Sequence, residues 1–211
     1  MKRPLRTVLN ERSLKMIGIP SKFLRTTLED FEDSTDFLSE VKDFVHNYIA
    51  NIDDNFDNNS GIFFNGSNGV GKTMLASIIL REAYRHRYTA RRSTFVEYMN
   101  QYTKVWDASL SDKETAEDSL YTYYKAVEFL VLEEVGKEID SKVSSPILED
   151  LLRYREDKGY VTIICTNLTF SDFTERYGAS CASLVQGNLV PVTIESEDVR
   201  KTAFRKRIKR S

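Results

Sequence analysis

The segment from Gly66 to Thr73 has the residue types and spacing of a phosphate-binding loop. It reads Gly-Ser-Asn-Gly-Val-Gly-Lys-Thr, follows an apolar run at residues 61–64 and precedes a helical pattern that starts at Met74. This order of strand, loop and helix is the context that the P-loop pattern G-x-x-x-x-G-K-[ST] requires. The backbone N–H groups of such a loop surround a phosphate, and the helix N-terminus adds partial positive charge. We therefore predict that the chain binds ATP with Mg²⁺.

The loop and the first residue after it supply the predicted nucleotide contacts. Lys72 is expected to reach the β- and γ-phosphates, and the Thr73 hydroxyl is expected to bind Mg²⁺. A glycine-rich turn without a ligand is the weaker interpretation, because this combination arises by chance in under roughly 1 % of chains of this length. The predicted contacts are Gly66, Ser67, Asn68, Gly69, Val70, Gly71, Lys72, Thr73 and Met74.

Two consecutive acids, Glu133 and Glu134, end a second apolar run in the manner of the Walker B pattern. The first carboxylate of that pattern holds Mg²⁺ through water, and the next orients or deprotonates the attacking water. Many buried strands end in charge, so the pattern is specific here only because it lies downstream of a P-loop. We predict that Glu133 holds Mg²⁺ together with Thr73, and that Lys72, Glu133 and Glu134 act in catalysis.

Asn167 ends a third apolar run, which is rich in β-branched residues and covers residues 160–167. In an NTPase this side chain would lie beside the γ-phosphate and share the catalytic water with Glu134. By itself, an asparagine after a strand is an ordinary turn residue. Cys165 in the same run is expected to be an inert buried thiol.

The remaining pattern predicts an α/β fold that brings these residues together. Apolar runs predict strands, and apolar residues at helical spacing predict helices. Pro191 places the last strand at a sheet edge, and Gly178 ends the helix before it. Strands are expected near residues 61–64, 93–97, 129–134, 160–167 and 189–194, and helices near 35–50, 74–87, 98–106, 144–158 and 169–177. We expect an irregular lead-in at 1–33, a polar linker at 51–60, and a loop with one helix at 107–124.

Composition and charge argue against several classes of protein. The 211 residues carry a net charge of −2, two histidines and two cysteines, which argues against a disulfide framework or a zinc site. No apolar run is long enough to span a bilayer, and no signal peptide is evident, so we expect a cytoplasmic protein without membrane contact. Both ends are basic, and the tail is either solvated or in contact with nucleic-acid phosphates. The tail residues predicted to make that contact are Arg205, Lys206, Arg207, Lys209 and Arg210.

With these residues in place, the chain resembles the DnaC/DnaI-like helicase loaders, which are AAA+ ATPases of bacteria and phages, and their relative IstB, a transposition helper. The resemblance covers roughly residues 15–200. Besides the P-loop it rests on Ile19–Leu24, Thr27–Phe31, Leu132–Glu138 and Thr162–Leu168.

The resemblance implies a RecA-like P-loop NTPase fold with five parallel strands in the order 5-1-4-3-2 and helices on both faces. It implies that ATP governs assembly on single-stranded DNA and on a hexameric replicative helicase, and that the chain forms an ATP-dependent homo-oligomer. Asn167 then takes the sensor-1 position, and Arg200 lies near a sensor-2 position. We divide the chain into a lead-in with an amphipathic helix (1–50), an AAA+ core (51–199) and a basic tail (200–211).

Three features depart from the family pattern. Glu133 replaces the usual aspartate, which adds a methylene to the Mg²⁺ shell. The usual arginine finger has no counterpart within residues 179–184, and Arg176 replaces it only if the geometry shifts. Such a finger contributes about 10³–10⁵ in rate. The chain alone is therefore expected either to hydrolyse ATP poorly and act as an ATP-dependent switch, or to borrow an arginine from a partner. The segment before the core is short, so we expect residues 1–50 or the core itself to contact a helicase.

Three other functions also stay open. An IstB-like transposition helper would prefer duplex DNA, and a P-loop kinase would form ADP only with its small-molecule acceptor. A structural nucleotide binder would bind ATP without turnover. No Arg-rich lid or acceptor motif lies between the P-loop and Glu133, which speaks against the kinase. The leading expectation is a loader that delivers a helicase to single-stranded DNA during DNA replication.

Overall fold

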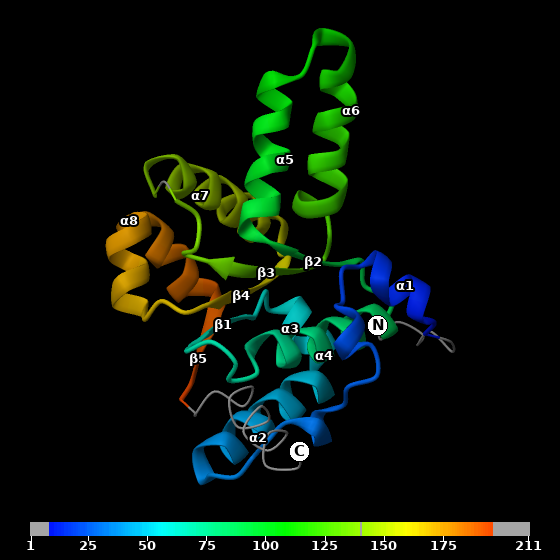
Figure 1. Cartoon of the computed structure of the whole chain (residues 1–211), viewed down its shortest axis with the longest axis vertical. Helices are drawn as coiled ribbons and strands as arrows, with labels where there is room; N and C mark the ends of the chain where they lie inside the picture. The colour runs from blue at the N-terminus through cyan, green and yellow to red at the C-terminus, as the bar shows by residue number, and fades with distance from the viewer. Residues whose placement is uncertain (1–8, 140, 196–211) are drawn as a thin grey trace, which may run out of the picture.

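The computed structural model of the protein describes residues 9–139 and 141–195. At the centre of this region is a sheet of five parallel strands in the order β2-β3-β4-β1-β5, which confirms the predicted order 5-1-4-3-2 (Figure 1). The strands are β1 (Gly61–Gly66), β2 (Ala90–Thr94), β3 (Phe129–Val135), β4 (Val161–Thr166) and β5 (Leu189–Ile194). Because neighbouring strands are parallel, the residues that follow β1, β3 and β4 meet at one end of the sheet, where α/β proteins bind ligands.

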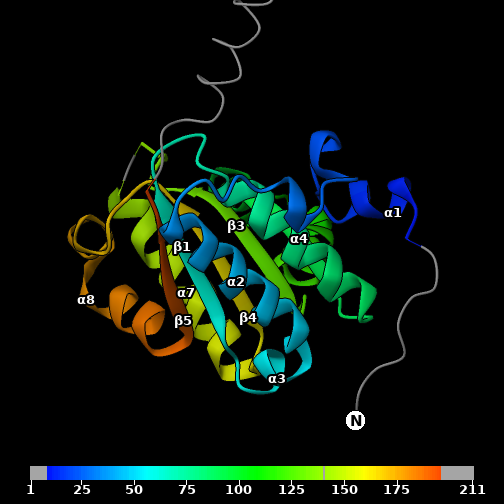
Figure 2. The ribbon, with the colours of Figure 1, turned by 90° about the horizontal axis from the view of Figure 1, so that it is seen from below.

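Helices cover both faces of the sheet (Figure 2). One layer contains α2 (Asp36–Ala50), α3 (Ile52–Asp57) and α4 (Lys72–Arg85), and the other contains α7 (Ser141–Lys158) and α8 (Phe170–Asn188). Alternating strand residues divide the core between the layers. Phe64 belongs to the cluster with α4, whereas the neighbouring Phe63 packs against Phe173 of α8. Burial on both faces explains why the strands appear in the sequence as continuous apolar runs.

The lead-in and α2 are part of the layer that contains α4. The helix predicted at 35–50 is confirmed as α2, with Val41 and Val45 among its buried residues. The expectation of an irregular segment at 1–33 is wrong in part, because it contains α1 (Glu11–Met16) and two short 3-10 turns, Ser21–Phe23 and Leu28–Asp30. The linker expected at 51–60 likewise contains α3.

Two further boundaries differ from the prediction. The strand expected at 93–97 ends at Thr94, because Thr94 and Glu97 form a capping box that starts α5 (Phe95–Asp107). The helix expected at 169–177 breaks at Gly178, with φ 87° and ψ 166°, but α8 then continues to Asn188. The edge position predicted for the last strand is confirmed, since β5 pairs with β1 alone.

A helical hairpin projects from the β2 edge of the sheet (Figure 1). It consists of α5 and α6 (Leu110–Leu120), which lie side by side. A π-helical turn, Tyr121–Lys125, leads from α6 towards β3. Within this turn Tyr124 is buried, whereas Tyr121 and Tyr123 are half exposed. The one helix expected within residues 107–124 is therefore α6.

Arg155 of α7 fixes the amino ends of β3 and β4. Its fully buried guanidinium donates hydrogen bonds to the Thr162 hydroxyl at 2.9 Å and to the Val127 carbonyl at 2.7 Å. Its other acceptors are the backbone carbonyls of Tyr124, Lys125, Glu128 and Val161. A guanidinium keeps its charge at any ordinary pH, so it needs these acceptors when buried. They hold α7 against the two strands that lead to Glu133 and Asn167.

Two expectations concern contacts with nucleic acid and with a membrane. The tail cations Arg205, Lys206, Arg207, Lys209 and Arg210 lie outside the described residues, as does Arg200, so their predicted contacts stay predictions. Among the helices of the described part, none combines the length and the apolar character needed to cross a membrane.

Candidate nucleotide-binding site

A cavity of about 730 Å³ lies at the carboxyl ends of β1, β3 and β4. The P-loop forms one side of it, the two acids after the Walker B run form another, and the lead-in forms a third. The structure therefore places most of the predicted site residues around one space. Those that line it are Asn68, Gly69, Val70, Gly71, Lys72, Thr73, Met74, Glu133, Glu134 and Asn167.

Two glycines of the P-loop stand where a side chain does not fit. Gly66 has φ 144°, and a Cβ atom there would lie 2.3 Å from the carbonyl oxygen of Ile194 in β5. Gly71 has φ 109°, and its Cβ would lie 2.8 Å from the ring of Phe31. Only glycine adopts both the conformation and the close approach without strain. Because α4 begins directly after Gly71, its N-terminus and partial positive charge face the cavity.

The Lys72 ammonium lies at the centre of a hydrogen-bond network. It donates to the carbonyl oxygens of Gly66 at 2.6 Å and Ser67 at 2.7 Å. It also donates to Asn167 Oδ1 at 2.9 Å, and Asn167 Nδ2 donates to Asn68 Oδ1 at 2.9 Å. Asn167, which directly follows β4, thus contacts the P-loop although it lies 95 residues from Lys72 in sequence. A phosphate oxygen is a stronger, charged acceptor of the kind that these donors can bind.

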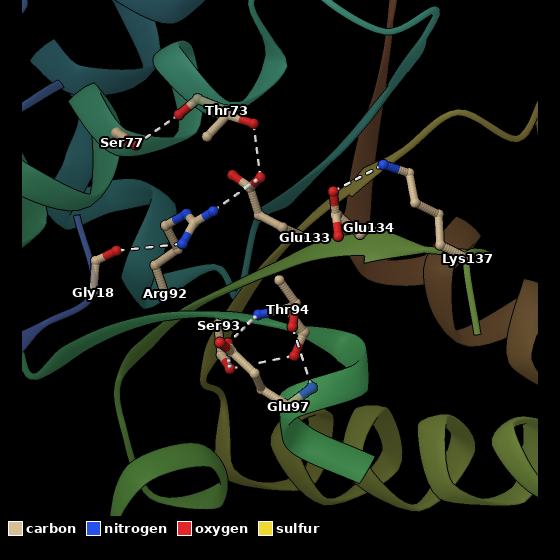
Figure 3. Close-up of polar contacts among 10 residues, drawn as sticks. All are labelled: Gly18, Thr73, Ser77, Arg92, Ser93, Thr94, Glu97, Glu133, Glu134 and Lys137. Carbon is tan, nitrogen blue, oxygen red and sulfur yellow. Dashed lines mark hydrogen bonds and ion pairs between the residues drawn. The ribbon is translucent and has the colours of Figure 1, made fainter. Parts of the chain in front are cut away.

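Thr73 and Glu133 form a second polar pair beneath the loop (Figure 3). The Thr73 hydroxyl donates to Glu133 Oε2 at 2.7 Å, and the Glu133 side chain is almost fully buried. The other oxygen, Oε1, is buried without a hydrogen-bond partner among the described residues. An unpaired buried acceptor beside a hydroxyl suits Mg²⁺, which prefers hard oxygen ligands. In the described part no group of three His, Cys, Asp or Glu residues gathers into a metal site, so phosphate and water would supply the remaining ligands.

Glu134 differs from its neighbour because the strand is irregular between Glu133 and Val135. Glu134 has φ 59°, and its exposed carboxylate pairs with Lys137 at 2.8 Å. Figure 3 shows the Glu133 carboxylate turned towards Thr73 and the Glu134 carboxylate turned towards Lys137. Both carboxylates still line the cavity. The bulge therefore lets two adjacent acids point in different directions and still line one cavity.

Glu138 ties the loop after β3 to α8. Its buried carboxylate accepts hydrogen bonds from Gly136 N–H at 3.0 Å and from the Ser144 hydroxyl at 3.2 Å. Arg176 Nε donates to it at 3.0 Å, and the Tyr177 hydroxyl donates to the same oxygen. Arg176 does not line the cavity, and the segment 179–184 contains no arginine. In this structure Arg176 is thus a partner of Glu138, and its contact with a nucleotide stays a prediction.

Several residues around the cavity were not predicted from the sequence. Arg92 of β2 pairs with Glu133, with Nη2 3.3 Å from Oε2, and Lys137 pairs with Glu134. A charged residue inside a strand is a signal, but the strand was predicted to start at Ser93, so Arg92 fell outside it, whereas β2 begins at Ala90. The lead-in residues form no sequence pattern that predicts their position on one side of the cavity. Those that line the cavity are Pro20, Lys22, Phe23, Asp30, Phe31 and Glu32, together with Leu38 of α2.

Cys165 also lines the cavity, and we expect its thiol to be unreactive. Burial raises the pKa of its thiol well above the ordinary value. The neighbouring Glu133 carboxylate acts in the same direction. Because the thiolate is the reactive form, the side chain behaves as a small apolar group.

The chain matches the model of the IstB-like ATP-binding proteins over residues 6–209. It belongs to that family. The replicative helicase loader DnaC of Escherichia coli K12 is 22 % identical over 182 residues, which cover 84 % of this chain and 70 % of DnaC. DnaC of Buchnera aphidicola is 20 % identical over 196 residues, which cover 90 % of this chain and 76 % of that protein. The resemblance to DnaC-like loaders seen in the sequence is confirmed.

Solved structures of similar proteins agree in fold. The crystal structure of the DnaC helicase loader superposes with a TM-score of 0.70 at 18 % identity, covering 83 % of this chain and all of that chain. The crystal structure of DnaI gives a TM-score of 0.68 at 21 % identity, covering 85 % and 96 %. The initiator DnaA, bound to AMPPCP and single-stranded DNA, gives 0.69 at 18 % identity, covering 90 % and 56 %. The AAA+ P-loop fold is therefore confirmed.

Proposed function

We propose that this protein is an ATP-binding loader that delivers a hexameric replicative helicase to single-stranded DNA during DNA replication. One observation carries the proposal. Lys72, Asn167 and the Thr73–Glu133 pair converge on one cavity in a fold that superposes on the DnaC helicase loader. ATP is the ligand that this constellation suits, since it offers the phosphates for the loop and completes a Mg²⁺ shell with Thr73 and Glu133.

The site residues divide the work between binding and hydrolysis. Lys72 and the loop N–H groups hold the phosphates, while Asn167 and Glu134 orient the attacking water, with Glu134 as the base that takes its proton. When bound, Mg²⁺ would neutralise the charge that develops on the phosphates. We expect slow turnover by the chain alone, because Arg176 is engaged by Glu138 and no arginine occupies 179–184. The protein then stays in its ATP-bound state until a partner supplies an arginine that permits hydrolysis.

The proposed partners follow from the relatives and from the charge distribution. DnaC is named a replicative helicase loader, so a hexameric helicase is the proposed protein partner. Single-stranded DNA is the proposed nucleic acid, contacted by the basic tail with an affinity that falls steeply as salt increases. We further propose an ATP-dependent homo-oligomer and a cytoplasmic location.

The test is ATP binding and turnover by the purified protein, with and without single-stranded DNA. Lys72→Ala removes the ammonium at the loop and is expected to abolish binding. Lys113→Ala changes an exposed lysine of α6 and serves as the matched control. Turnover that needs DNA and a candidate helicase supports the switch, whereas wild-type protein that binds no ATP under any condition refutes the proposal.

A second candidate is an ATP-dependent helper of a transposase, because the matching family is described as IstB-like. Such a helper would bind duplex DNA more tightly than single strands and would form large assemblies with ATP. Competition between matched single-stranded and duplex oligonucleotides separates the two functions. ADP that forms only when a small-molecule acceptor is added would instead indicate a kinase, and ATP binding without turnover in every mixture a structural nucleotide binder.

A further inference from the structure

Arg92 places a cation against the carboxylate that is proposed to hold Mg²⁺. Its Nη2 lies 3.3 Å from Glu133 Oε2, the same oxygen that accepts the Thr73 hydroxyl hydrogen bond (Figure 3). Both members of the pair are sheltered, with 18 % of the Arg92 side chain and 5 % of the Glu133 side chain exposed. A buried carboxylate needs such compensation, because leaving water without a counter-charge is costly.

The lead-in holds the Arg92 backbone and side chain in place. The Arg92 N–H donates to the Ile17 carbonyl at 2.7 Å, which covers the outer edge of β2. Its Nη1 donates more weakly to the Gly18 carbonyl at 3.4 Å. Arg92 also lines the nucleotide cavity. The guanidinium is thus positioned on both sides, by the lead-in and by Glu133.

The length of the Glu133 side chain suits both of its partners. Glu133 Oε2 reaches Thr73 of α4 and Arg92 of β2 at once. An aspartate is shorter by one methylene, about 1.5 Å, and would leave at least one of these partners. Glu133 and Arg92 therefore form a matched pair, in which the longer acid bridges the P-loop helix and the edge strand.

We propose that Arg92 is a positioning residue, a built-in counter-ion of Glu133 that lets ATP bind without Mg²⁺. The inference rests on the proposed ATP-binding function. With Arg92 in place, the pair is neutral before any Mg²⁺ arrives, so incoming phosphates do not meet an unpaired carboxylate. Without it, the Glu133 charge repels the phosphates unless Mg²⁺ lies between them. Arg92 acts through Glu133 and not by contact with the nucleotide.

The experiment measures the affinity of the full chain for AMPPCP by calorimetry, once with excess Mg²⁺ and once with EDTA. The quantity of interest is the ratio of the two dissociation constants. We expect a small ratio for wild type and a ratio about tenfold larger for Arg92→Gln. An opposite charge within about 4–6 Å stabilises a charged carboxylate by an amount equivalent to about tenfold or more in an equilibrium constant. Arg92→Lys keeps the charge and should stay close to wild type.

Two further variants separate this role from a general disturbance. Arg91→Gln changes the neighbouring residue of β2, which contacts the Tyr123 ring and the Met16 carbonyl, and should leave the ratio unchanged. Adding Glu133→Gln to Arg92→Gln removes the uncompensated charge and should restore binding in EDTA. Thermal unfolding of each variant verifies that it is folded.

The outcomes distinguish the inference from the function on which it rests. Wild-type protein that binds AMPPCP in neither condition refutes the proposed function. Wild-type binding with an unchanged ratio in Arg92→Gln refutes the counter-ion alone. An equal loss of affinity with Mg²⁺ and with EDTA also overturns it, since that result indicates direct contact between Arg92 and the phosphates.

Discussion

Replacing Arg176 with methionine tests how firmly the loop after β3 is tied to α8. The substitution keeps an extended side chain but leaves the Glu138 carboxylate, 3 % exposed, without its cation. Breaking a buried pair in this way costs about 3–5 kcal/mol of unfolding free energy. Here the Tyr177 hydroxyl, the Ser144 hydroxyl and the Gly136 N–H still bind the carboxylate, and the Arg176 side chain is itself 25 % exposed. We therefore expect a smaller loss of unfolding free energy, about 2–3 kcal/mol.

The assay is urea unfolding followed by circular dichroism at constant salt. Glu138→Gln and the double variant Glu138→Gln/Arg176→Met complete a cycle, whose coupling energy should be about 1–3 kcal/mol because the double variant buries no charge. Arg153→Met is the control, since Arg153 pairs with Glu149 at a similar distance but at the surface, and it should unfold close to wild type. Equal losses for Arg176→Met and Arg153→Met, or strict additivity in the cycle, would refute the reasoning.

Three more predictions follow from particular contacts. Arg155→Leu leaves several buried carbonyls without a donor and should lower the unfolding free energy by about 3–5 kcal/mol, as measured by urea unfolding. Gly71→Ala forces a Cβ into the Phe31 ring at φ 109° and should cost about 1–3 kcal/mol and weaken ATP binding, as measured by calorimetry. The Thr94 backbone N–H lowers the pKa of Glu97 below its ordinary 4.5, so this stabilisation is present above pH 4.5 and lost as the pH falls through the lower folded-state pKa. Glu97→Gln should flatten the pH dependence of melting there, and an unchanged profile would contradict it.

Much of the fold was predictable because its signals are local. The P-loop is one continuous segment, and strands buried on both faces leave unbroken apolar runs, so the strands follow from the sequence. The parallel order 5-1-4-3-2 came instead from the resemblance to DnaC/DnaI-like loaders. The boundaries that were wrong have local causes as well. Thr94 and Glu97 form a capping box that starts α5 and so ends β2, although the apolar residues around Phe95 suggest a continuing strand. Beyond Gly178 the helix resumes, because one left-handed glycine interrupts a helix without preventing the next turn.

The site was predictable only where chemistry leaves a residue pattern. Lys72, Glu133 and Asn167 belong to recognised patterns at strand ends, and the parallel topology brings such ends together. Arg92 and Phe31 reach the same cavity through tertiary packing, and neither belongs to a pattern that predicts contact with a nucleotide. The roles of all these side chains stay predictions until nucleotide binding is measured.

The two acids near the carboxyl end of β3 are held with different strength, and this difference suits the two roles proposed for them. Glu133 is buried and bound by Thr73 and Arg92, so its carboxylate keeps one position, as a Mg²⁺ ligand must. Glu134 pairs with Lys137 at the surface, where both side chains are about half exposed and the pair is easily broken. A general base has to exchange partners during each turnover, which a sheltered pair would resist. If Glu134 is the base, we therefore expect it to leave Lys137 during turnover, while Glu133 stays fixed throughout.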